Sequence, residues 1–387
     1  MRLKALIIPD KFKGTLTAKA AAEAIARGWR RGRPGDKLEL LPMSDGGDGF
    51  GEVLSALLGA VTQKVNTRDA AHRPCTARWW WQPRSKTALI ETAGIVGLAM
   101  LPTGRFHPFE LDTFGLGNVV RAALAKRPRR LLVGLGGSAT NDGGFGMARA
   151  LGWEFVNASG EIIERWTNLA AATELHPPAN LPRLPEVVVA VDVQNQLLGP
   201  RGASRVYGPQ KGLRPRDFPA AERCLRRLAL LIRRTSGLDL AGVPGAGAAG
   251  GLGFGFSAFL KGQLEAGFEL FAREVELDKR LGKADVVVTG EGAMDGSTFM
   301  GKGAGQVARR CRALGIPCFG VAGIVRQTGF SKHGFTEIHA LTELTTLRRA
   351  KAEPALWLER LAKQTAGCWR PPKSTNREIR PDPITSS

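Results

Sequence analysis

The chain is poor in the residues that bind zinc or cross-link small folds. Its 387 residues include five cysteines, an odd number with no CxxC pair, and five histidines with no HxxxH pair. We therefore expect a reduced, cytoplasmic protein without structural zinc, and a catalytic or metal-binding histidine is not favoured. No run of 18 apolar residues is present, so no transmembrane helix is expected. The apolar segment Leu3–Ile8 is short and is followed by Asp10 and Lys11, so we interpret it as a strand and not as a signal peptide.

Acidic residues are scarce relative to basic ones. The chain has 35 Asp and Glu against 55 Lys and Arg, which gives a formal net charge of +20. Such an excess favours an anionic partner, which could be nucleic acid, an acidic membrane or a phosphate-rich small molecule. The densest basic stretch, Arg223–Arg234, places leucines at helical spacing and predicts an amphipathic helix with a solvated basic face. No basic and aromatic module of the RNA-binding kind is visible, so we expect neither a nucleic-acid nor a membrane partner.

Strand-like and helical segments alternate along the chain, which is 43% hydrophobic and long enough for two or three domains. This alternation predicts an α/β protein in which helices cover mostly parallel sheets. The predicted strands are 3–8, 37–41, 78–81, 88–90, 131–133, 187–193, 285–289 and 316–322. The predicted helices are 50–58, 117–126, 145–151, 223–234 and 301–314, with another that Thr17 caps. The polar, proline-rich tail 371–387 is expected to be disordered.

Polar side chains follow several predicted strands directly. They are Asp10, Asp45, Ser138, Asp192 and Glu291. Because ligands of parallel α/β sheets bind at the carboxyl ends of the strands, these residues are candidates for a common site.

The most informative loop is Val133–Gly144, with the sequence VGLGGSATNDGG. Its glycines let backbone N–H groups converge on an anion, and a helix is expected to begin at Phe145. Asp142 would repel a phosphate unless a metal ion lay between them, so we interpret it as a metal ligand. The residues expected to hold nucleotide phosphates here are Gly136, Gly137, Ser138, Thr140 and Asn141.

Four further loops combine carboxylates, glycines and lysines. They are Pro9–Gly14, Pro42–Gly49, Val191–Gly212 and Thr289–Gly303. A simple charged turn explains each loop almost as well when it is taken singly. Together they suit phosphoryl transfer, which needs positioned phosphates, a bridging metal ion and a base near the acceptor hydroxyl group.

Two matches to nucleotide-binding motifs are weak. Gly296–Lys302 fits GxxxxGK, but Gly303 stands where a P-loop needs Ser or Thr. Gly134–Ala139 fits a loose dinucleotide fingerprint, yet the following TNDGG is poor helix material. An NAD-dependent dehydrogenase is therefore a minor alternative, as is a nucleic-acid-binding protein suggested by charge alone. The glycine-rich segment Gly245–Gly255 fits either close packing or phosphate contact.

Several motifs in order resemble the bacterial glycerate kinase family, of the glycerate 2-kinase type, from about residue 1 to residue 325. They are PDKFKGTLTA, PMSDGGDG, GLGGSATNDGG, DVQNQLLGPRGA, YGPQKG, PGAGAAGGLG and TGEGAMD followed by TFMGK. The resemblance implies ATP-dependent phosphorylation of D-glycerate to 2- or 3-phosphoglycerate with Mg²⁺. It also implies a discontinuous Rossmann- or flavodoxin-like domain and an inserted α/β domain, with the active site in the cleft between them. We place the first at 1–85 plus 283–370 and the second at 86–282.

The chain departs from the family pattern at a few positions. Asp48 stands where the family often has glutamate, and Ala293 replaces the arginine of the usual GEGR. The family's usual Thr-Tyr-Gly-Thr-Gly run is replaced by the segment Asp112–Gly117. The missing guanidinium at Ala293 bears on substrate choice more than on kinase chemistry.

Each candidate residue then receives a role. Asp45 or Asp192 is the expected base, and Lys11 is the third catalytic candidate. Contacts to glycerate or to the transferred phosphoryl group are expected from Lys13, Asp48, Asn195 and Lys211. Lys302 is expected to contact phosphate. The expected metal ligands are Asp142, Glu291 and Asp295, for which contacts to ribose are the alternative. A monomer and a homodimer are both compatible with the sequence.

Overall fold

The computed structural model describes residues 2–180, 183–299, 303–326 and 330–370. Lys302 and the predicted disordered tail 371–387 lie outside the described residues. The described strands form two large sheets and one small one, so the α/β prediction is confirmed. None of the described helices is both long and apolar enough to cross a bilayer.

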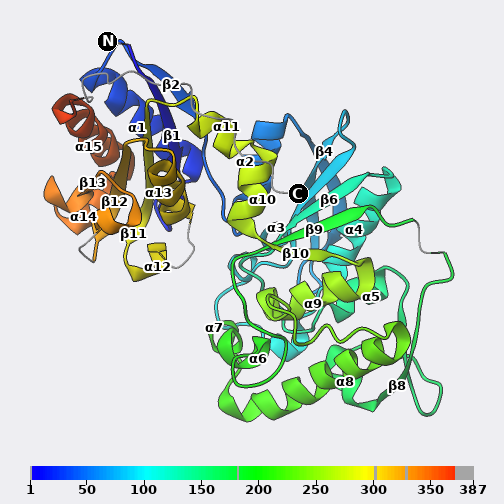
Figure 1. Cartoon of the computed structure of the whole chain (residues 1–387). Helices are drawn as coiled ribbons and strands as arrows, with labels where there is room; N and C mark the ends of the chain where they lie inside the picture. Colours follow the sequence, from blue (N-terminus) through cyan, green and yellow to red (C-terminus); the bar gives the residue numbers. More distant parts are fainter. Residues whose placement is uncertain (1, 181–182, 300–302, 327–329, 371–387) are drawn as a thin grey trace.

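The first sheet is built from both ends of the chain and forms the left lobe in Figure 1. Its strands are β1 (Lys4–Pro9), β2 (Lys37–Leu40), β11 (Val286–Met294), β12 (Cys318–Val325) and β13 (Glu337–Ala340). Neighbouring strands are parallel and follow the order β2-β1-β11-β12-β13. Counted within this sheet the order is 2-1-3-4-5, which is the flavodoxin-like order, with its switch point between β1 and β11.

Alternate residues of the β1 strand face different layers of the left lobe. Ala5 and Ile7 pack with helices α1 (Ala18–Gly32) and α15 (Pro354–Cys368). Leu6 and Ile8 pack on the other face, where α13 (Gly303–Ala313) lies. As predicted, Thr17 caps α1, since its side chain accepts a 3.1 Å hydrogen bond from the backbone N–H of Ala20.

The second sheet is mixed and forms the right lobe. Its strands are β3 (Val61–Arg68), β4 (Pro74–Gln82), β5 (Thr87–Glu91), β6 (Arg130–Gly134), β9 (Glu186–Val191) and β10 (Gln263–Ala266). The order is β10-β9-β6-β5-β4-β3, with antiparallel pairing only at β5-β4 and β4-β3. The predicted domain boundary at 85/86 therefore falls inside this sheet. A short turn joins β4 to β5, and antiparallel neighbours can be linked in this way.

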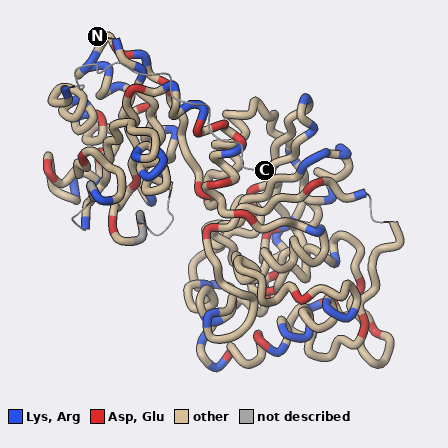
Figure 2. Tube along the Cα trace, in the orientation of Figure 1, with Lys and Arg blue, Asp and Glu red and all other residues tan. Residues whose placement is uncertain are grey.

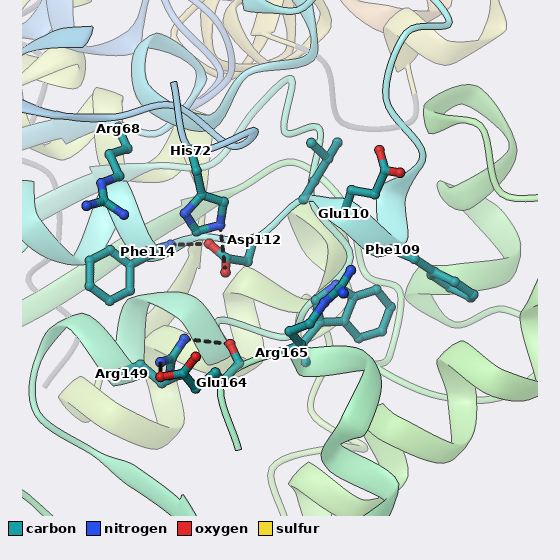
Figure 3. Close-up of a pocket in the computed structure, with 11 residues that line it drawn as sticks. Arg68, His72, Phe109, Glu110, Asp112, Phe114, Arg149, Glu164 and Arg165 are labelled. Carbon is teal, nitrogen blue, oxygen red and sulfur yellow. Dashed lines mark hydrogen bonds and ion pairs between the residues drawn. The ribbon is translucent and has the colours of Figure 1, made fainter. Parts of the chain in front are cut away.

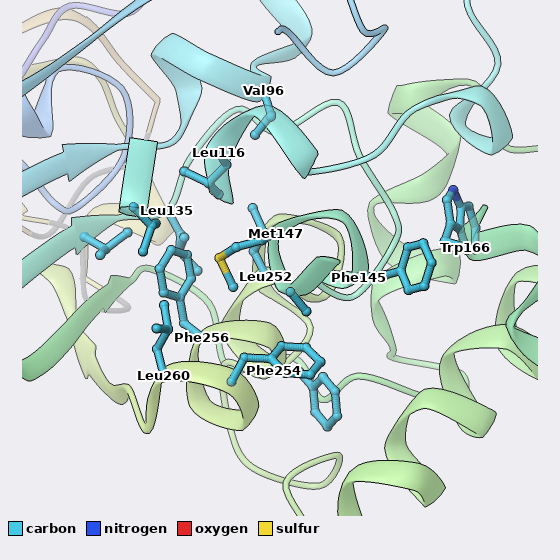
Figure 4. Packing of buried hydrophobic residues seen from close by; sticks show 14 of the residues in the cluster. Val96, Leu116, Leu135, Phe145, Met147, Trp166, Leu252, Phe254, Phe256 and Leu260 are labelled. Carbon is cyan, nitrogen blue, oxygen red and sulfur yellow. The ribbon is translucent and has the colours of Figure 1, made fainter. Parts of the chain in front are cut away.

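Helices cover both faces of the second sheet. Toward the left lobe lie α2 (Phe50–Leu58), within its predicted limits, and α10 (Gly267–Glu274). The opposite face carries α4 (Phe114–Ala125), α5 (Phe145–Ala150), α8 (Phe218–Ser236) and α9 (Ala248–Leu260). Figure 4 shows part of the core beneath them, with Phe145, Met147, Phe254 and Phe256 packed together. The helix α8 is amphipathic as predicted, since it buries Leu225, Leu228 and Leu231 and exposes most of its arginines.

The shorter elements complete the two lobes. They are α3 (Ala93–Val96), β7 (Glu154–Asn157), β8 (Ala172–His176), α6 (Ala203–Val206), α7 (Gly208–Lys211), α11 (Leu277–Leu281), α12 (Gly296–Phe299) and α14 (Leu347–Ala352). One hydrophobic cluster contains side chains from both large sheets, including Leu6 and Val287 from the first and Leu132 and Val188 from the second. Lys and Arg are spread over both lobes, as the sequence predicted (Figure 2).

Candidate active site

A cavity of about 1710 Å³ is lined by loops of both lobes. From the first lobe come residues after β1 and β2 and residues of β11, and from the second come residues after β6 and β9. The sequence therefore predicted correctly that loops after strands meet at one site. The predicted site residues that line the cavity are Lys11, Lys13, Asp45, Asp48, Gly136, Gly137, Ser138, Asp192, Lys211, Glu291 and Asp295.

Asp10 is a central side chain of this cavity, although the sequence reasoning gave it no role. It directly follows β1, and its Oδ1 accepts a 2.7 Å hydrogen bond from the backbone N–H of Lys11. Burial raises the pKa of Asp10 to about 7, and the negative charges of Asp45 and Glu291 act in the same direction. The sequence feature that points to Asp10 is its position directly after a predicted strand. Only the tertiary structure brings the carboxylates of Asp45 and Glu291 close enough to raise the pKa of Asp10.

Asp192 and Asp45 approach each other from different sheets. Asp192 follows β9 and is exposed to solvent, whereas Asp45 lies in the loop after β2. Partial desolvation by the surrounding chain raises the pKa of Asp192 although the residue still contacts solvent, and the charge of Asp45 raises it further, while the positive charge of Lys11 opposes them. Both predicted bases therefore occupy one electrostatic environment with a lysine beside them.

Glycines allow the Asp45 loop to lie against the second lobe. A Cβ atom on Gly267 would lie 1.7 Å from the backbone oxygen of Asp45, and one on Gly46 would lie 2.8 Å from the Cβ of Ala190. Gly46 also has a φ of +96°, a conformation that L side chains rarely adopt. The two glycines thus set how closely Asp45 approaches the strand that precedes Asp192.

Glu91 holds the neighbouring loop, and the sequence reasoning missed it. Its two carboxylate oxygens accept 2.9 Å hydrogen bonds from the backbone N–H groups of Gly49 and Gly51 at the start of α2. The Nζ of Lys11 donates a 2.9 Å hydrogen bond to the backbone oxygen of Asp48 in the same loop. Glu91 thereby satisfies donors at a helix N-terminus and fixes the loop that carries Asp48.

The loop 134–144 divides into a part that lines the cavity and a buried half that does not. Gly136, Gly137 and Ser138 line the cavity. Thr140 and Asn141 are fully buried and do not line it, so their predicted direct contact with nucleotide is not what the structure supports. Instead Thr140 Oγ1 lies 2.8 Å from Ser138 Oγ, and Asn141 Nδ2 donates to Ser204 Oγ at 2.9 Å.

Asp142, which the sequence analysis interpreted as a metal ligand, does not line the cavity. Its side chain is fully buried, and Oδ2 accepts hydrogen bonds from Thr113 N at 2.9 Å, Thr113 Oγ1 at 2.7 Å and Gly146 N at 2.9 Å. Burial raises the pKa of Asp142 to about 6, and the charge of Asp112 adds to this effect. The physical reason for its position is that the first amides of α4 and α5 need an acceptor.

Lys211 lies at the end of α7 and lines the cavity while its ammonium group is buried. Its Nζ donates a 2.7 Å hydrogen bond to the backbone oxygen of Thr140. Burial lowers the pKa of Lys211 to about 7, against the opposing charge of Asp142. The predicted lysine is therefore in the site, with a charge that responds to what occupies the cavity.

Asn195 does not line the cavity, which corrects its predicted contact with substrate. Its Nδ2 donates to the backbone oxygen of Arg201 at 2.8 Å, and its Oδ1 accepts from the hydroxyl group of Tyr207 at 2.5 Å. Tyr207, the one tyrosine of the chain, does line the cavity. Asn195 therefore contacts the cavity through Tyr207, whose hydroxyl group it holds.

The three predicted metal ligands are not assembled into one site. Among residues 2–370, apart from the undescribed gaps, no three or more His, Cys, Asp or Glu side chains are grouped to hold a metal ion. Thr298 Oγ1 donates to Glu291 Oε1 at 2.8 Å and accepts from the backbone N–H of Asp295 at 3.1 Å, so these two residues do share one turn. The side chain of Asp142 instead accepts hydrogen bonds from Thr113 and Gly146.

Comparison with known proteins identifies the family. The model described as "Glycerate kinase family" matches residues 5–370. The chain belongs to the glycerate kinase family.

Individual members of the family are similar over nearly the whole chain. The chain is 35% identical to a glycerate kinase of Halalkalibacterium halodurans, covering 93% of this chain and 97% of that one. It is 34% identical to the glycerate 2-kinase of Escherichia coli K12, covering 90% of this chain and 93% of that one. A solved structure from Salmonella typhimurium LT2, titled "putative glycerate kinase 2", matches with a TM-score of 0.82 and 32% identity, over 94% of this chain and 97% of that one. The resemblance drawn from the motifs is confirmed.

Proposed function

We propose that the cavity between the two sheets is where this member of the glycerate kinase family transfers the γ-phosphoryl group of ATP to a hydroxyl group of D-glycerate. Glycerate kinase activity itself follows from membership of the family, whose model matches nearly the full chain. One observation carries the assignment of the site: carboxylates and lysines from both lobes converge on the same cavity. Phosphoryl transfer depends mainly on positioning and charge stabilisation, which this convergence supplies.

The loop 134–138 is the proposed phosphate-binding wall. Gly136, Gly137 and Ser138 line the cavity, and Gly137 has a φ of +50°, which turns its backbone toward a conformation that favours glycine. Without side chains on the two glycines, phosphate oxygens can approach the backbone N–H groups directly. Lys211 lies behind the same loop and supplies a positive charge when phosphates enter.

Asp192 is the proposed base that accepts the proton of the glycerate hydroxyl group. Its raised pKa brings it nearer to neutral pH, where a base transfers protons most effectively, and its carboxylate is exposed to solvent in the cavity. Asp45 supports this assignment in two ways. Its Oδ1 already accepts a 3.2 Å hydrogen bond from Gly47 N, and its negative charge strengthens the proton affinity of Asp192.

Lys11 and Lys13 are proposed to bind the carboxylate of glycerate and the transferred phosphoryl group. Lys13 is exposed in the cavity, whereas Lys11 lies among the carboxylates and is fixed by its hydrogen bond to Asp48. Lysine is a mobile point charge that can follow a phosphoryl group as it moves between donor and acceptor.

The acidic side chains fit a magnesium ion shared with the phosphates of ATP. Asp45 and Glu291 both raise the pKa of Asp10, which shows an excess of negative charge that a divalent cation would relieve. Mg²⁺ is usually held by one or two carboxylates plus substrate phosphates, so a closed protein cage is not required. We propose Asp10 and Glu291 as its protein ligands. When bound, the ion would neutralise charge on the transferred group.

The decisive experiment is an assay of ADP release with ATP, Mg²⁺ and D-glycerate, with the product identified by phosphorus NMR. We expect glycerate-dependent ADP release and a single phosphoglycerate, whose resonance distinguishes the 2- from the 3-isomer. Absence of glycerate-dependent ADP release would contradict the proposed reaction. Full activity after replacement of both Asp10 and Asp192 would leave the reaction standing and contradict this location for it.

A further inference from the structure

A second cavity, of about 480 Å³, lies in the right lobe and shares no lining residue with the large one. It is enclosed by the turn between β3 and β4, the segment 109–114 before α4, Arg149 of α5 and the segment 164–166 (Figure 3). Its volume falls within the range of small-molecule sites. Nothing in the proposed kinase reaction uses these residues.

The cavity lining carries three arginines and three carboxylates, which are Arg68, Arg149, Arg165, Glu110, Asp112 and Glu164. Arg149 donates to the backbone oxygen of Glu164 at 2.6 Å, and its guanidinium lies 5.9 Å from the centroid of the Phe114 ring. Arg68 and Arg165 are exposed, and neither side chain has a hydrogen bond or ion pair with any residue in the described part of the chain. Two guanidinium groups are thus available at one cavity.

His72 lies on the same side of the cavity and is paired with a carboxylate. Its Nε2 lies 3.1 Å from Asp112 Oδ2, and Figure 3 shows the ring directed at that carboxylate. The hydrogen bond to Asp112 raises the pKa of His72, whereas the charges of Arg68 and Arg149 lower it, so both arginines are close enough to act on the ring. The Asp112 carboxylate is therefore already paired with this ring, whereas the guanidinium groups of Arg68 and Arg165 have no side-chain partner in the described part of the chain.

We propose that this cavity binds a small anionic metabolite through Arg68, Arg149 and Arg165. The guanidinium group presents paired donors that match the oxygens of a carboxylate or a phosphate ester. The aromatic side chains Phe109 and Phe114 give the cavity an apolar wall for the rest of such a molecule.

The cavity is connected to the phosphate-binding loop by consecutive residues. Asp112 lines the cavity, and its Oδ1 accepts a 2.9 Å hydrogen bond from Phe114 N. Thr113, between them, donates both its N–H and its hydroxyl group to Asp142 Oδ2, and its Oγ1 accepts from Met147 N at 2.8 Å. A ligand that orders Asp112 therefore also restrains the buried half of the loop 134–144.

Hydrogen exchange measured on the full chain without nucleotide tests this proposal. The probes are inorganic phosphate and citrate, each compared with sodium chloride at equal ionic strength. We expect at least one probe to slow exchange in segments 109–114 and 142–147. The probe that does so distinguishes a phosphate from a carboxylate site. The half-saturating concentration read at 109–114 should rise at least fivefold in both Arg68→Ala and Arg165→Ala.

Arg226→Ala is the matched control, because Arg226 is exposed on α8, lines neither cavity, and its loss changes the net charge equally. It should leave the half-saturating concentration unchanged. An equal increase in Arg226→Ala would show general attraction to a basic protein and overturn the site. Absence of protection at 109–114 with either probe would also overturn it, and protection at 109–114 without any at 142–147 would overturn the connection to the loop.

Discussion

The ammonium group of Lys211 is buried and donates a 2.7 Å hydrogen bond to the backbone oxygen of Thr140, within the glycine-rich loop. This bond joins α7 to the wall that we propose for the phosphates. Burial lowers the pKa of Lys211 to about 7, so the lysine is largely neutral at pH 8 while the cavity is empty. An anion in the cavity would favour the charged form and raise this pKa.

Nucleotide binding should therefore be accompanied by proton uptake at Lys211. At pH 8 we expect up to about one proton taken up per ATP bound, and little uptake by this group at pH 6, where the lysine is already charged. Calorimetry in buffers with different ionisation enthalpies measures this number.

Lys211→Met provides the control for this prediction. The variant should lose the uptake at pH 8 and bind ATP more weakly. For the empty protein, the native pKa of about 7 lies below the ordinary value of 10.5, so the unfolded state binds more protons between these pH values. The free energy of unfolding should thus rise with pH across that interval, and less steeply in Lys211→Met. Equal uptake in both proteins would contradict the assignment.

Asp192→Asn should reduce kcat by about 10²–10⁴-fold, since the amide cannot accept the hydroxyl proton. The measurement is kcat at saturating ATP and D-glycerate, with circular dichroism to show that the fold is kept. Because the pKa of Asp192 is raised, activity of the parent should decline on acidification at a higher pH than for an ordinary aspartate. Asp239→Asn, at an exposed carboxylate remote from the cavity, should match the parent. A kcat within threefold of the parent for Asp192→Asn would move the role of base to Asp45.

Gly136→Ala should separate the two loops that meet in the cavity. A Cβ atom at Gly136 would lie 2.9 Å from the Cα of Gly47 and 3.1 Å from Asp48 N, where backbone must move to make room. We expect the free energy of unfolding to fall by about 1–3 kcal/mol and kcat/KM for ATP to fall at least tenfold. Gly35→Ala has open space around the new methyl group and should change neither quantity. Parent-like kinetics in Gly136→Ala would contradict the proposed phosphate wall.

Asp142→Asn should keep the Mg²⁺ dependence of the parent, because Asp142 is a structural acceptor for Thr113 and Gly146. Its native pKa of about 6 exceeds the ordinary value of 3.8. The stabilisation from holding this proton is complete below about pH 4 and is lost as the pH rises to about 6, which amounts to about 3 kcal/mol. Denaturant unfolding across this interval should therefore show a shallower decline in the variant. A large increase in the Mg²⁺ concentration needed for activity would restore the metal-ligand interpretation.

Local sequence signals predicted the elements that depend on local preferences. The limits of α2 and the cap at Thr17 follow from nearby residues, and both are confirmed. The positions of Asp45 and Asp192 after strands could also be anticipated. Their convergence could not, because the two residues follow strands of different sheets. The pairing of β3 and β4 with β5 was missed, since the sequence pattern does not state which sheet a strand joins.

The order of motifs along the sequence determined the family and hence the activity. The reason is that so many separate motifs in one order rarely occur together in unrelated proteins. The tertiary structure decided which polar residues face the cavity. Asp142, Asn141 and Asn195 stand in the same motifs as Asp192 and Lys211, yet the first three satisfy buried amides, hydroxyl groups or a neighbouring carbonyl. Glu91 emerged only from the folded chain, and so did the grouping of Asp10 with Asp45 and Glu291. The physical reason is that the partners of a polar group are set by contacts between distant segments, while spacing along the chain specifies only which groups are present.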